Sequence, residues 1–100
     1  MKNQRFGIEI EMTGLTRKRA SEIIAMHFQS QSIYIGGPYA EYSVKDLENR
    51  KWKIMYDGSI TPEDMDGYRA RDEYKVEVVS PICRYQDIED IQKIVRKLRE

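Results

Sequence analysis

Two glutamates near the start of the chain are placed where carboxylate chemistry is possible. Glu9 and Glu11 alternate with Ile8, Ile10 and Met12, and this period of two predicts a strand over 6–12. Both carboxylates then project from one face of that strand, about 7 Å apart. Negative groups so close repel each other unless a positive charge lies between them. The pair is therefore a candidate ligand set for a cation.

A third glutamate lies in another predicted strand. Glu77 interrupts a valine-rich run over residues 75–80, and its neighbours Val76 and Val78 would face the opposite side from its carboxylate, toward the helices. If this strand pairs with the first, three carboxylates gather on one surface. Such a hard-oxygen site suits Mg²⁺ or Mn²⁺, which also keep water ligands for phosphate oxygens. Asp57, after a predicted strand over 52–56, would border the same site.

The same spacing has a simpler interpretation. Glu-x-Glu on a strand is usually a solvated sheet face, where lysines or arginines on neighbouring strands pair with the carboxylates. Spacing alone does not establish a metal site.

The other predicted elements would position these residues. Thr16 is a plausible N-cap for a helix that reaches Phe28, and we interpret His27 on its apolar face as structural. A second amphipathic helix covers 87–99, with Ile88, Ile91, Val95 and Leu98 inward. The remaining predicted strands cover 39–44, 52–56 and 75–80. A short apolar run covers 33–35 and ends in a turn, and a polar loop covers 61–73. The order β-α-β-β-β-α favours an α+β fold, an antiparallel sheet with two helices packed on one face.

Composition excludes several classes of protein. The 100 residues hold 17 Lys+Arg and 17 Asp+Glu, so the net charge is zero, which disfavours a basic nucleic-acid binder. No apolar run is long enough to span a membrane. Cys83 is the single cysteine, which excludes a disulfide or zinc knuckle within one chain. We expect a cytoplasmic domain with no nucleic-acid or membrane partner.

Three motifs in order resemble the amidoligase family, relatives of glutamate–cysteine ligase and glutamine synthetase. They are the run FGIEIE over 6–11, Trp52 followed by DGSI over 57–60, and EVVSP over 77–81. The predicted helix from Thr16 lies between the first two. The resemblance covers most of residues 5–90 and implies a partial glutamine-synthetase or glutamate–cysteine-ligase-like fold.

The resemblance also implies an activity. Family members join a carboxylate to an amine with ATP, and divalent ions hold the phosphates. Carried over by position, Glu9, Glu11 and Glu77 would bind Mg²⁺ or Mn²⁺ and the metal–ATP complex. Asp57 and Ser59 would lie beside the substrate or metal as catalytic residues. The substrates would be small-molecule or peptide carboxylates and amines.

The family pattern continues beyond residue 100, with later strands that contribute further acidic and basic groups. We therefore expect residues 1–100 to be the N-terminal part of a catalytic domain that does not turn over substrate alone. Two alternatives stay open. One is a non-catalytic fragment or degenerate relative that acts as a binding or assembly module and dimerises through exposed sheet edges. The other, a metal-dependent nuclease, is weakened by the neutral charge and by the lack of a lysine near the acidic pair.

Overall fold

The computed structural model describes residues 4–57 and 74–99. Its strands are β1 (Arg5–Phe6), β2 (Glu9–Met12), β3 (Ser32–Gly36), β4 (Glu41–Lys45), β5 (Lys51–Met55), β6 (Val76–Val79) and β7 (Cys83–Arg84). Its helices are α1 (Arg17–His27) and α2 (Ile88–Arg99), and a 3₁₀ turn, Tyr85–Asp87, precedes α2. The predicted loop over 61–73 lies outside the described residues.

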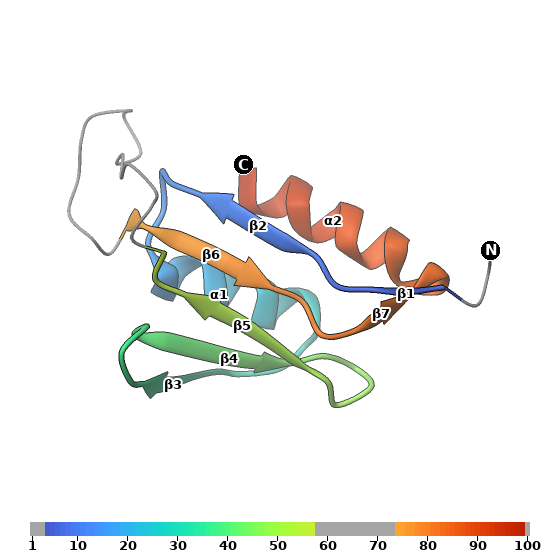
Figure 1. Cartoon of the computed structure of the whole chain (residues 1–100), viewed down its shortest axis with the longest axis horizontal. Helices are drawn as coiled ribbons and strands as arrows, with labels where there is room; N and C mark the ends of the chain where they lie inside the picture. The colour runs from blue at the N-terminus through green and yellow to red at the C-terminus, as the bar shows by residue number, and fades with distance from the viewer. Residues whose placement is uncertain (1–3, 58–73, 100) are drawn as a thin grey trace.

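Five strands form one antiparallel sheet in the order β2-β6-β5-β4-β3. Figure 1 looks onto this sheet, with α1 behind it and α2 running beside β2. The predicted α+β class is confirmed, with an antiparallel sheet and two helices. The predicted element order lacked one strand, because the run around Ile33 forms a full strand, β3.

The predicted first strand over 6–12 is interrupted, and Ser80 explains why. The backbone N–H of Ile8 donates to Ser80 Oγ at 2.9 Å, while the N–H of Ser80 donates to the carbonyl of Ile8 at 3.0 Å. The Ser80 hydroxyl thus accepts the hydrogen bond that a backbone carbonyl would accept in a regular strand pair. The backbone ladder between β2 and β6 ends at this point. β1 then pairs separately with β7.

One face of the sheet encloses the core together with both helices. Trp52, Ile54, Val76 and Val78 are at most 1% exposed, and Phe28 of α1 packs on Trp52 with ring centroids 5.5 Å apart. Alternate residues of the same strands point away from the helices. We call this second side the open face; its residues on β2, β6 and β5 are Glu9, Glu11, Glu77, Val79, Lys51, Lys53 and Met55.

The two helices begin as local sequence dictates. Thr16 caps α1 as predicted, since its Oγ1 accepts the N–H of Arg19 at 3.1 Å. The predicted inward face of α2 was wrong at its first residue: Ile88 is 37% exposed, whereas Ile94 is fully buried. Asp87 takes the inward position at the helix start, so the adjacent Ile88 turns outward.

Among the described residues neither helix is long and apolar enough to cross a bilayer.

A group of charged residues, which we call the arginine network, joins the β4–β5 hairpin to the start of α2. It consists of Asp46, Arg50 and Asp87. Arg50 donates to Asp46 Oδ2 at 2.9 Å and to both Asp87 oxygens at 2.9 and 3.0 Å. Asp46 also accepts the Trp52 indole N–H at 3.2 Å. These bonds attach the hairpin to the core and to the far end of the chain.

Candidate functional site

The strand register brings carboxylates from three separate segments together on the open face. β2 pairs with β6 so that Glu11 lies directly opposite Glu77. On the other side of β6, Met55 lies opposite Glu77, and Asp57 follows two residues later. The pairing of the first strand with the Glu77 strand, on which the predicted site depends, is therefore present.

The three side chains converge closely enough to share an ion. Glu11, Asp57 and Glu77 each offer one carboxylate oxygen, and these oxygens all lie within 4.8 Å of one another. We call this group the carboxylate cluster. Oxygens on opposite sides of a bound Mg²⁺ lie about 4.2 Å apart, and those around Ca²⁺ about 5 Å apart. The spacing thus has the dimensions of a divalent-cation coordination sphere, and the donors are the hard oxygens that such ions prefer.

The electrostatics of the cluster show repulsion among like charges. The pKa of Glu11 is raised above its usual value, mainly by the negative charge of the Asp57 carboxylate. A hydrogen bond between the two side chains raises it further. Burial raises the pKa of Glu77, and the charges of Glu9 and Asp57 raise it further. Each of these causes disfavours the ionised carboxylate.

Glu9 shares the predicted face of β2 with Glu11 but lies outside the carboxylate cluster. It lies one position along the open face, opposite Val79, and does not belong to the group whose oxygens lie within 4.8 Å. Its negative charge still raises the pKa of both Glu11 and Glu77. Its role as a metal or nucleotide ligand stays a prediction.

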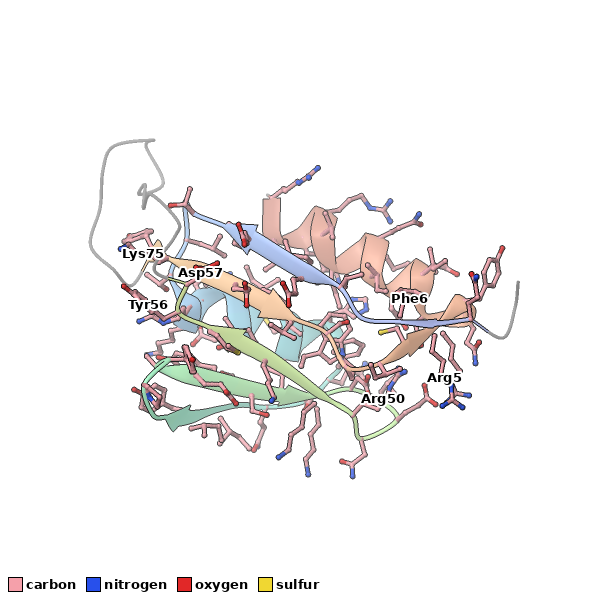
Figure 2. The ribbon with its side chains drawn as sticks, in the orientation of Figure 1. Arg5, Phe6, Arg50, Tyr56, Asp57 and Lys75 are labelled. Carbon is pink, nitrogen blue, oxygen red and sulfur yellow. The ribbon has the colours of Figure 1, made fainter. Side chains whose placement is uncertain are left out.

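On a solvated sheet face, lysines or arginines would pair with the glutamates, and residues 4–57 and 74–99 provide no such pair for the two glutamates of the cluster. Glu11 and Glu77, and also Glu9, form no ion pair with any residue in the described part of the chain. Nearby, Arg17 and Lys75 lie over the ring of Tyr56, 5.7 and 5.5 Å from its centroid. Figure 2 shows Tyr56, Asp57 and Lys75 at one end of β5, with Arg50 near the other.

Other candidate residues lie apart from the cluster. Ser59 falls outside the described residues, so its position next to the substrate stays a prediction. His27 joins α1 to α2: its Nδ1 accepts from Lys97 at 2.9 Å, and its Nε2 then donates to Asp90 at 3.0 Å. These partners agree with a structural histidine. A groove of about 1120 Å³ lies between β2 and the two helices, but it includes neither Asp57 nor Glu77.

Sequence reasoning missed one residue that positions the cluster. Ser80 bonds to both backbone groups of Ile8, and this pair continues the register that sets Glu11 opposite Glu77. A serine before a proline at the end of a valine-rich strand was visible in the sequence. The partner strand was not, so nothing pointed to this bond.

A family model described as "Putative amidoligase enzyme" matches residues 2–100. The chain belongs to this family. The resemblance drawn from the three motifs is thereby confirmed, and a ligase-type function follows at a coarse level. No curated protein and no solved structure matches the chain. The likeness of this amidoligase-family chain to the glutamine synthetase fold stays a prediction.

Proposed function

We propose that this chain is part of an ATP-dependent carboxylate–amine ligase, in which the carboxylate cluster binds the Mg²⁺ or Mn²⁺ that accompanies the nucleotide. The observation that carries the proposal is the convergence of three carboxylate oxygens within 4.8 Å of one another. Family membership supports it, because it separates this cluster from an ordinary acidic sheet surface.

The proposed reaction has two steps. A substrate carboxylate oxygen attacks the γ-phosphorus of ATP, and the bond from that phosphorus to the bridging oxygen breaks to release ADP. The amine nitrogen of the second substrate then attacks the acyl carbon. Phosphate leaves with the carboxylate oxygen, and the nitrogen loses a proton. A divalent cation supplies charge neutralisation for the phosphates in the first step.

The side chains of the chain have distinct proposed roles. Glu11, Asp57 and Glu77 hold the cation, and their mutual repulsion makes an empty cluster unfavourable. Glu9, one position along the face, adds negative charge to the site and would contact the nucleotide through the metal. Asp57 and Ser59 would lie beside the substrate, as family resemblance implies. The substrates are carboxylates and amines, as small molecules or at the end of a peptide.

Isothermal titration with Mn²⁺ and with Mg²⁺-ADP tests the proposal. We expect the chain to bind Mn²⁺, and we expect Glu11→Gln to weaken that binding at least about tenfold, because a charged ligand is lost from the coordination sphere. Glu89→Gln is the matched control, since Glu89 is an exposed glutamate on α2 whose side chain pairs with Lys93. Indistinguishable curves for Glu11→Gln and Glu89→Gln would refute the cation site.

A second candidate function, assembly into a homodimer, is favoured by strand β3. β3 is an edge of the sheet, and it exposes Ile33, Tyr34 and Ile35 at 52, 61 and 58%. Edge strands are usually protected from further pairing by charged side chains, and residues 32–36 carry none. We propose that β3 pairs with β3 of a second copy.

Light scattering after size exclusion tests this assembly. We expect a dimer for the unmodified chain and a monomer for Ile33→Lys, since a lysine on this edge opposes pairing. Leu47→Lys changes a still more exposed apolar residue in the β4–β5 hairpin and should leave the dimer intact. A monomer for the unmodified chain at high concentration would contradict the proposal.

A further inference from the structure

The open face carries a lysine beside the carboxylate cluster. Lys53 of β5 lies opposite Val79, and Val79 in turn lies opposite Glu9. Lys53 and Glu77 are therefore diagonal neighbours on adjacent strands, about 7–8 Å apart at their Cα atoms. A lysine side chain is long enough to cover that distance. The sheet thus brings a lysine close to Glu77 that the local sequence around the glutamates does not contain.

Lys53 is exposed and forms no ion pair with any residue of the described ranges. Two more lysines continue the positive charge away from the cluster. Lys51 lies on the same side of β5, about 7 Å farther along, and Lys45 is its cross-strand partner. Both line a groove of about 450 Å³ with Ile33 and Ile35. The open face therefore changes from negative to positive along β5.

This arrangement affects a bare cation and an anion in opposite ways. A lysine next to a divalent-cation site repels the cation, so it weakens binding of the ion alone. It attracts an oxyanion that already has one oxygen on that cation, because the ammonium can then donate a charge-assisted hydrogen bond to another oxygen. A cation site with an unpaired lysine beside it is suited to a metal-bound anion.

We propose that Lys53 anchors an oxyanion that bridges the cation at the carboxylate cluster and the Lys53 ammonium. This inference rests on the proposed function, since it needs a cation in the carboxylate cluster. It adds Lys53 as the residue that selects an oxyanion as the ligand of that cation. Two sources share the required chemistry: a nucleotide phosphate and a substrate carboxylate. Lys53 is the nearest of the three lysines to the cluster along the strand register.

Three variants at exposed lysines of β5 test the inference. Lys53→Met removes the charge, Lys53→Arg retains it, and Lys51→Met is the matched control on the same strand and face. Binding of Mn²⁺ alone, of ADP with saturating Mn²⁺, and of L-glutamate with saturating Mn²⁺ is measured by titration calorimetry. Circular dichroism melting verifies that each variant folds.

We expect Lys53→Met to bind Mn²⁺ alone as well as the unmodified chain or about twofold tighter, because a nearby positive charge is lost. The same variant should bind one of the two anions at least about fivefold more weakly. Lys53→Arg should retain most of that affinity, and Lys51→Met should change it less than about twofold. Loss for ADP identifies phosphate as the anion, and loss for glutamate identifies carboxylate.

Two other outcomes have separate meanings. If Mn²⁺ binds but Lys53→Met and Lys51→Met behave alike with both anions, the role of Lys53 is refuted while the cation site stands. If the unmodified chain binds no Mn²⁺, the proposed function fails, and the inference fails with it.

Discussion

Two groups of carboxylates lie near opposite ends of β5 and have opposite electrostatics (Figure 2). In the arginine network, Arg50 bonds to both aspartates, and its guanidinium is the main cause that lowers the pKa of Asp87 to about 2. In the carboxylate cluster, like charges and burial raise the pKa values of Glu11 and Glu77. The first group is complete within the chain and stabilises the fold. In the second, the raised pKa values mean that the ionised carboxylates oppose folding.

The largest expected effect comes from breaking the arginine network. Arg50→Met leaves the Asp46 side chain, 2% exposed, and the Asp87 side chain, 9% exposed, without their cation. Removal of one partner from a buried ion pair costs about 3–5 kcal/mol, and we expect that loss in urea denaturation. Arg84→Met is the control, because the Arg84 side chain is half exposed and its ion pair with Glu48 is long, at 3.7 Å. Exposed ion pairs of this kind contribute little to stability. A loss below about 1 kcal/mol for Arg50→Met would show that the network does not stabilise the fold.

The pH dependence of stability should differ between the two groups. Because the folded pKa of Asp87 is about 2, its stabilisation is complete above the unfolded value near 4 and is lost as the pH falls toward 2. That contribution is about 2 kcal/mol. Asp87→Asn should remove this part of the acid dependence from thermal melts. An unchanged acid slope in Asp87→Asn would mean that another carboxylate dominates.

Ser80 links the strand register to the cluster, so its removal should affect both stability and binding. Ser80→Ala leaves the N–H of Ile8 without its acceptor, at a cost of about 1–2 kcal/mol. Mn²⁺ affinity should also fall, since the β2–β6 register positions Glu11. Ser80→Thr retains the hydroxyl and should preserve Mn²⁺ affinity. Normal Mn²⁺ binding in Ser80→Ala would show that the register does not depend on this bond.

The smallest effect, and one of opposite sign, is expected from neutralising the cluster. Since the folded pKa of Glu77 is raised, the ionised group destabilises the fold fully at neutral pH, and the penalty disappears as the pH falls below about 4. Glu77→Gln should therefore stabilise the metal-free chain at pH 7 by less than about 1 kcal/mol, while it weakens Mn²⁺ binding. Destabilisation at pH 7 would contradict the repulsion described for the cluster.

Local signals in the sequence predicted most elements, while contacts between distant segments explain the differences. Thr16 and the hydrophobic period predicted α1, and alternation predicted that Val76 and Val78 face the helices. The break at Ile8 depends on Ser80, and the outward turn of Ile88 depends on Asp87 bonded to Arg50. No local pattern contains these partners.

The candidate site shows the same division. Spacing predicted that Glu11 and Glu77 would share a face if their strands paired, and it placed Asp57 at the border. The register decided that an oxygen of Asp57, rather than one of Glu9, lies within 4.8 Å of oxygens of both glutamates. It also placed Lys53 beside them, a position that depends on which strands are neighbours and so has no signature in the sequence.

Glu11, Asp57 and Glu77 lie far apart in the chain, and this separation has a kinetic consequence. Their oxygens meet only after β6 has inserted between β2 and β5, which requires closure of two long loops. During refolding, a Mn²⁺ signal from the cluster should therefore appear later than the far-ultraviolet signal of the helices. The ion would report the moment at which the central strand completes the sheet.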